Sequence, residues 1–153
     1  MPYCTVADVQ AAVRGPAKLV ELTDDLNEGG DGDPYTAAQL DVANKAIRTA
    51  DGVINSYVGH RYAVPLSPVP DTISTLSAEW AARVLRRRGT QGMSLQDDLD
   101  QEKVDREWLD GIARGVYSLG VEPTPGAASI VSDDVGVRDS TLTVSRERMK
   151  DFI

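Results

Sequence analysis

Four carboxylates close together in the sequence come nearest, by type and spacing, to residues that could do chemistry: Asp97, Asp98, Asp100 and Glu102. Paired carboxylates can act as a general acid and a general base when neighbouring groups tune their proton affinity. No His or Lys converges on this run in the sequence pattern. The run also occupies the first turns of a predicted helix, where negative charge is favourable. We therefore interpret these acids as an exposed, solvated helix start, and the enzyme hypothesis is disfavoured.

Metal and nucleophile chemistry has no better support. The acidic segment NEGGDGDP at residues 27–34 lacks the ligand spacing and the final Glu of an EF-hand, so we expect a solvated loop there. The chain holds one His, His60, and one Cys, Cys4, which argues against a His-based site and an internal disulfide. No Ser-His-Asp, Cys-His, HExxH or phosphate-loop arrangement is present. We predict no catalytic residue, no metal and no cofactor, and we expect Cys4 to be a small buried residue.

Three consecutive arginines, Arg86, Arg87 and Arg88, end a predicted helix just before Gly89. Basic residues in a last turn complement the helix dipole, and the Gly can act as a left-handed cap. The same arginines could instead contact an acidic partner surface or, together with Arg83, the phosphates of DNA. A formal net charge of −8 argues against the last option, because phosphate binding needs a basic surface. A small helical DNA-binding or regulatory protein that uses this cluster is the alternative prediction.

A stiff elbow at residues 57–66, with the sequence YVGHRYAVPL, separates two predicted helices. A long helix carrying Tyr57 must stop at Gly59, and an extended stretch follows. Three prolines then keep the backbone extended until the next helix begins. The extended stretch carries Arg61 and Tyr62. These two side chains could dock against a neighbouring chain, or they could brace their own chain by bonding helix-end carbonyls and filling the core. The residues alone leave both possibilities open.

Apolar residues at spacings of three and four predict the helices that must position these groups. Thr5 with Asp8, and Thr36 with Gln39, form capping boxes that start two of them. Asp71 is expected to cap a third, and Ser94 with Asp97 opens a fourth. The apolar positions of the last three helices are Leu40, Ala43, Ile47, Ala50, Ile54 and Tyr57; Ile73, Leu76, Trp80 and Val84; and Leu95, Leu99, Trp108, Leu109 and Ile112.

The fold predicted from these elements is mainly α, a small antiparallel bundle of about four helices with the elbow between two of them. With 153 residues, of which 41% are hydrophobic and only 5% aromatic, the chain can bury one core made mostly of small aliphatic side chains. No stretch approaches the roughly 20 apolar residues that span a bilayer, and no secretion signal is evident. We expect a protein made in the cytoplasm that has no membrane partner. The helical body should cover residues 1–120.

Residues 121–153 differ in composition and predict an extended, strand-prone C-terminal arm. Prolines and glycine open it, and three short β-prone runs follow, the last of which contains Leu142 and Val144. Isolated short strands are marginally stable, so the arm should either be disordered in the free protein or pair with another chain by strand addition. Met149 and Phe152 add two apolar anchors beside a basic flank.

Four motifs together resemble the small head-tail adaptor, or head completion, family of Mu-like phages and prophages. They are the elbow pattern YxGxRYxVPL, the segment IARGVYSLG at residues 112–120, the opening Pro2-Tyr3 with Thr5 and Asp8, and the basic ending from Met149 to Phe152. The resemblance covers most of the chain in order. It implies a mainly helical connector subunit that forms a ring, expected to be dodecameric, between the portal and the neck of a virion.

The resemblance also implies the partners. They are other copies of the chain, the portal protein, a neck, stopper or tail-terminator protein, and passing genomic DNA that is not bound sequence-specifically. A surface as acidic as this one should keep DNA from sticking to the channel wall. The residues expected to contact a neighbouring subunit or the portal are Tyr57, Arg61, Tyr62, Arg86, Arg87, Arg88, Leu142, Val144, Arg146, Arg148, Met149 and Phe152.

Overall fold

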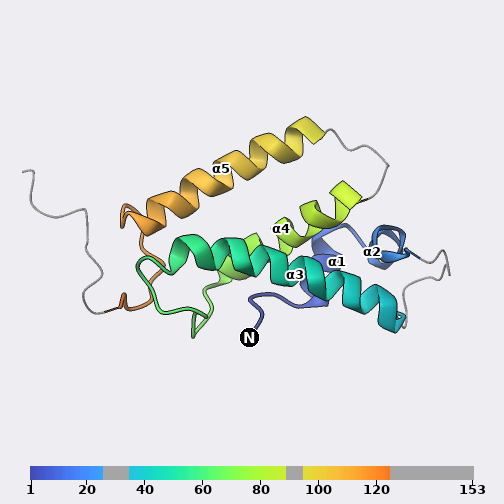
Figure 1. The fold of residues 1–153 in the computed structure, drawn as a ribbon, viewed down its shortest axis with the longest axis horizontal. Coiled ribbons are helices and arrows are strands. Elements are labelled where there is room, and N and C mark those ends of the chain that lie inside the picture. The colour runs from blue at the N-terminus through green and yellow to red at the C-terminus, as the bar shows by residue number, and fades with distance from the viewer. Residues whose placement is uncertain (26–34, 89–94, 125–153) are drawn as a thin grey trace, which may run out of the picture.

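The computed structural model describes residues 1–25, 35–88 and 95–124. The helices of these residues are α1 (Val6–Ala12), α2 (Pro16–Thr23), α3 (Ala37–Val58), α4 (Asp71–Arg88) and α5 (Leu95–Ala113), and the described residues contain no strand (Figure 1). Helices α3, α4 and α5 run in alternating directions, while α1 and α2 pack against α3 and α4. The mainly α fold is therefore confirmed. The predicted loop at 27–34, Gly89 and most of the predicted arm lie outside the described residues.

Both predicted capping boxes are present. The Asp8 carboxylate accepts from the Thr5 backbone N–H at 2.7 Å, and the Thr5 hydroxyl accepts from the Asp8 N–H at 3.3 Å. Thr36 and Gln39 make the reciprocal pair at the start of α3. Asp71, in contrast, is the first residue of α4 and not its cap. The carbonyl of Pro70 accepts from Ile73 and Ser74 instead, so Asp71 contributes only negative charge to the first turn.

The core lies mainly between α3 and α4, whose contact is the most extensive of any helix pair in the described residues. Ala43, Ile47, Ala50 and Ile54 of the predicted α3 stripe are buried there. Two predicted apolar contacts are wrong. Leu40 is 36% exposed because Gln39 folds back onto its own helix start and is buried in its place. Leu99 is 44% exposed because charged residues, not leucine, make the buried face of that part of α5.

The segment before α1 is tied into the core by a small polar network. The Tyr3 N–H donates to Asp51 Oδ2 at 3.2 Å, and the Tyr3 hydroxyl donates to Asn55 and accepts from the Leu66 N–H at 3.1 Å. Ser77 Oγ lies 2.7 Å from Asp51 Oδ1. The network joins residues before α1 to α3, α4 and the elbow, so it fixes their relative positions.

Cys4 lies beside this network and is buried, as predicted, with its sulfur 3.2 Å from Ser77 Oγ. Burial raises the pKa of its thiol, which leaves little thiolate to react. None of the helices in the described ranges is long and apolar enough to cross a membrane.

Candidate interaction surface

Tyr62 of the elbow fills the core of its own chain. Its side chain is 2% exposed, and its hydroxyl accepts a hydrogen bond from the Leu119 N–H at 3.3 Å. The backbone N–H of Tyr62 donates to the Val58 carbonyl at 2.9 Å, which ends α3 tightly. Tyr62 thus joins the end of α3 to the chain that follows α5, and the intramolecular interpretation of this residue matches its position.

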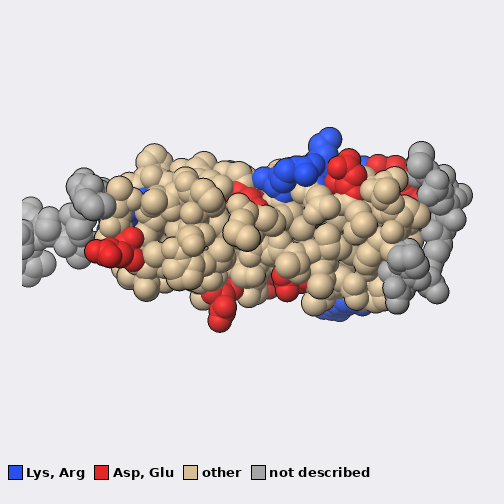
Figure 2. Space-filling model, turned by 90° about the horizontal axis from the view of Figure 1, so that it is seen from below, with Lys and Arg blue, Asp and Glu red and all other residues tan. Residues whose placement is uncertain are grey.

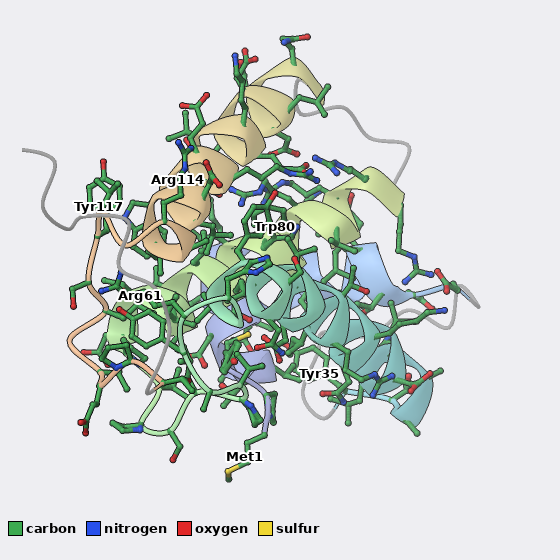
Figure 3. All side chains as sticks on the ribbon, turned by 60° about the vertical axis from the view of Figure 1, so that its left-hand side comes forward. Met1, Tyr35, Arg61, Trp80, Arg114 and Tyr117 are labelled. Carbon is green, nitrogen blue, oxygen red and sulfur yellow. The ribbon has the colours of Figure 1, made fainter. Side chains whose placement is uncertain are left out.

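Arg61 lies at the same junction, but its Nε and Nη1 are buried without a hydrogen-bond partner, so these atoms do not make the expected bonds to helix-end carbonyls. Its guanidinium lies so close to Gly115 that a Cβ built on that glycine would come within 1.6 Å of Nη1. Gly115 also has a φ of +80°, a conformation that favours glycine. The Arg61 carbonyl accepts from the Thr124 N–H at 2.9 Å. Figure 3 shows Arg61 and Tyr117 at the same end of the molecule, where the chain leaves α5.

The arginines that end α4 form ion pairs within the chain. Arg83 pairs with Asp105, Arg86 lies 3.0 Å from Asp98, and Arg87 pairs with Glu102, and we refer to these contacts as the α4–α5 ion pairs. Arg88 reaches Asp25, beyond the end of α2, at 2.5 Å. The arginine cluster therefore holds α5 and the residues after α2 against α4.

The prediction of a fully solvated start for α5 is wrong. Glu102 and Asp105 are each 8% exposed, because they face the arginines of α4. A signal for this was present in the sequence. Asp98, Glu102 and Asp105 recur at spacings of four and three, and Arg86 and Arg87 follow Arg83 at i+3 and i+4 on the preceding helix, so each set lies on one helix face. Only the fold shows that the two charged stripes face each other.

Trp80 lies beside the α4–α5 ion pairs and is almost fully buried (Figure 3). The guanidinium of Arg83 lies 5.2 Å from its ring centroid, and that of Arg106 lies 5.8 Å from it. Arg106 also contacts Glu102 at 2.6 Å. Glu102 with Arg106 and Asp110 with Arg114 form i,i+4 ion pairs along α5. Tyr57, half-buried at the end of α3, lines a shallow groove beside this part of α5.

The two arginines that contact Glu102 change its proton affinity. Burial opposes the charged form of Glu102, but the hydrogen bonds from Arg87 and Arg106 outweigh this effect and hold the pKa of its carboxyl below the ordinary value of 4.5. A carboxyl whose pKa is depressed by folding stabilises the folded state above its ordinary pKa. That stability is lost as the pH falls through the lower, folded-state pKa.

We therefore expect Glu102→Gln to be less stable than the wild-type protein at pH 7, and the difference to shrink as the pH falls below about 4.5. Urea unfolding followed by circular dichroism from pH 7 to pH 3 measures the difference directly. Glu107→Gln, an exposed change on the same helix, is the matched control and should track the wild-type protein throughout. A constant difference between Glu102→Gln and the wild-type protein across this range would contradict the role given to the two arginines.

Large apolar side chains are exposed on and just after α5. Leu99 is 44%, Val104 57%, Val116 61% and Tyr117 49% exposed. The ring of Tyr117 lies against Gly111, where a Cβ would come within 2.6 Å of the ring. Leu99 lines the same groove as Tyr57, and Val116 and Tyr117 follow the end of α5, so these exposed side chains are spread over separate parts of the surface. Apolar side chains exposed singly in this way are normal for a protein surface.

The structure places only half of the predicted contact residues. Tyr57, Arg61, Tyr62 and Arg86–Arg88 are described above, and they come from α3, the elbow and α4 without forming one continuous patch. Leu142, Val144, Arg146, Arg148, Met149 and Phe152 lie outside the described residues. Among the residues that the structure places, no group of three or more His, Cys, Asp or Glu side chains could hold a metal ion.

Comparison with known proteins adds one finding. The model of a family described as "Bacteriophage Mu, Gp36" matches residues 3–133 of the chain. The match begins before α1, extends past α5 and includes the elbow and every residue of the α4–α5 ion pairs. No curated protein matches the chain.

Proposed function

This chain belongs to the bacteriophage Mu Gp36 family, and from that premise we propose that it is a structural virion protein, the adaptor of the head-tail connector. In this proposal the copies form a ring, expected to be a dodecamer, on the portal protein. The ring joins the DNA-filled head to a neck, stopper or tail-terminator protein and surrounds the channel for the genome. The observation that carries the proposal is the family match, because it spans the whole helical body.

The internal bracing of the subunit supports this role. A ring subunit must keep its shape while neighbours attach on several sides, so the segments between its helices need fixed positions. Tyr3 ties the residues before α1 to α3 and the elbow, and Tyr62 and Arg61 tie the elbow to the chain after α5. Each of these contacts links residues far apart in the sequence.

The charge of the chain supports a channel role for the ring. Genomic DNA must pass without being held, and an acidic wall repels its phosphates. The net charge is −8, and the basic side chains on the face seen in Figure 2 form no continuous stripe. In the proposed ring, acidic residues rather than arginines face the channel.

The alternative, a DNA-binding or regulatory protein that uses Arg86–Arg88, receives less support from the geometry. Arg86, Arg87 and Arg88 each lie against a carboxylate of the same chain. A phosphate would have to displace these partners. Retention on DNA that weakens steeply with added salt would favour this alternative over the adaptor.

Electron microscopy of the protein mixed with the portal of the same phage or prophage tests the proposal. We expect a ring added to one face of the portal. We also expect a chain that ends after residue 124 to keep its helical circular dichroism spectrum and to lose portal docking. A portal that gains no density from the full chain would refute the adaptor role. Docking by the shortened chain would instead refute only the assignment of the arm.

A further inference from the structure

The guanidinium of Arg61 is partly buried and has no ionic partner among the residues that the structure describes. The described arginines that do pair with a carboxylate are Arg48, Arg83, Arg86, Arg87, Arg88, Arg106 and Arg114. Arg14 has no such partner either, but it is exposed, so water can solvate its charge. Arg61 differs from Arg14 because its Nε and Nη1 are enclosed and donate no hydrogen bond.

The surroundings of Arg61 keep its guanidinium in one position. Its backbone N–H donates to the Val58 carbonyl at 3.0 Å, and its own carbonyl accepts from the Thr124 N–H at 2.9 Å. Nη1 occupies the space that a Cβ at position 115 would need, so a larger residue in place of Gly115 would push the guanidinium away. Nη2 is the one nitrogen of this guanidinium that is not enclosed.

An anion at this open edge would remove the cost of the buried charge. Burying a charge without a partner opposes folding, and a carboxylate satisfies a guanidinium well through charge-assisted hydrogen bonds. The charge of a guanidinium is delocalised, so an anion at Nη2 compensates the whole group. The same chain shows a contact of this kind, because Nε and Nη2 of Arg86 donate to Asp98 at 3.4 and 3.0 Å.

We propose that Arg61 is an anion site whose ligand is a carboxylate from the segment after Thr124. The hydrogen bond from Thr124 places the start of this segment at Arg61, so the acids that follow reach the site at a high effective concentration. These acids, which lie outside the described residues, are Asp133, Asp134, Asp139, Glu147 and Asp151. A carboxylate from another copy in the proposed ring is the same chemistry from a second source, and that source alone rests on the proposed function.

A double-mutant cycle in the full chain tests the site. Arg61→Met removes the charge and keeps an unbranched side chain. The amide variant replaces all the acids after Thr124: Asp133→Asn, Asp134→Asn, Asp139→Asn, Glu147→Gln and Asp151→Asn. In urea unfolding of dilute protein at low salt, the amide variant should lower the folding equilibrium constant at least about fivefold when Arg61 is present. It should leave that constant unchanged in the Arg61→Met background.

Two other arginines provide the controls. Arg14→Met removes an unpaired charge from an exposed position, so the amide variant should have the same effect with and without this change. Arg83→Met leaves the buried carboxylate of Asp105 without its partner and should lower the folding equilibrium constant on its own. The second control shows that the assay detects the loss of a buried pair whose two members are known.

Electron microscopy with the portal distinguishes the second source. If another copy supplies the carboxylate, the amide variant unfolds like the wild-type protein when dilute, and Arg61→Met leaves the isolated chain at least as stable. Arg61→Met should then weaken ring formation on the portal at least about tenfold, whereas Arg14→Met should not. This result would keep the anion site and assign its ligand to the neighbouring copy.

The outcomes separate this inference from the proposed function. If Arg61→Met neither couples with the amide variant nor weakens ring formation, Arg61 binds no carboxylate and the anion site is wrong, while a ring formed by the wild-type protein keeps the adaptor role. If the coupling is present but the wild-type protein adds no ring to the portal, the anion site stands and the adaptor role fails. If neither is observed, both proposals fail.

Discussion

Replacing Asp105 with Ala should destabilise the protein by about 3–5 kcal/mol, because it leaves the guanidinium of Arg83 buried without its counter-charge. Arg83 is 3% exposed and pairs with Asp105, which is 8% exposed. The Nε of Arg83 is buried and has no hydrogen-bond partner. Removing the Asp105 carboxylate would therefore add a second unsatisfied group to a guanidinium that already has one. Chemical denaturation at pH 7 gives the free energy of unfolding that checks this value.

Two further variants show which part of that effect belongs to charge. The double change Arg83→Met/Asp105→Leu replaces the pair with apolar groups of similar size and should recover most of the lost stability. Asp110→Ala removes the exposed i,i+4 pair with Arg114 and should cost no more than about 0.5 kcal/mol. If Asp105→Ala were as mild as Asp110→Ala, the buried character assigned to the α4–α5 ion pairs would be incorrect.

Replacing Tyr62 with Ala should also cost about 3–5 kcal/mol, which is typical of a large aromatic side chain removed from a core. Tyr62 is 2% exposed, whereas Tyr57, the other tyrosine of the elbow, is only partly buried against the core. Tyr62→Phe keeps the ring but leaves the Leu119 N–H without its acceptor, so we expect a smaller loss of about 1 kcal/mol.

His60, two residues earlier in the chain, provides the matched control. It is exposed, and His60→Ala should change stability by less than about 0.5 kcal/mol. The same variants separate bracing from docking. If Tyr62→Ala left the free energy of unfolding unchanged and instead weakened assembly on the portal, Tyr62 would hold a neighbouring subunit.

The sequence predicted the elements whose signals are local. Capping boxes at Thr5 and Thr36 and the apolar stripe of α3 depend on residues within a few positions of one another, so they could be identified without the fold. The face of α5 could not. Its buried side is set by arginines on another helix, and hydrophobic spacing alone placed Leu99 inside when it lies outside.

The candidate site was predictable to a smaller extent. The sequence identified Arg61, Tyr62 and the arginine cluster as distinctive, but it could not decide what they contact. Arg61 lies against Gly115 and Tyr62 accepts from Leu119, and each of these partners follows α5, more than fifty positions after the residue that it contacts. Interactions between residues so far apart depend on tertiary packing and produce no periodic pattern in the sequence.

The network around Tyr3 has a consequence for the order in which the chain folds. Its partners are Asp51, Asn55 and Leu66, and Ser77 completes it from α4. Contacts between residues so far apart in the sequence have a large entropic cost of loop closure, so they form late in folding. During synthesis the segment at Tyr3 therefore leaves the ribosome long before its binding site exists, and it can be buried only after α4 has been made. A chain synthesised only as far as the end of α3 would therefore lack the contact of Asp51 with Ser77 and the hydrogen bond between Leu66 and the Tyr3 hydroxyl.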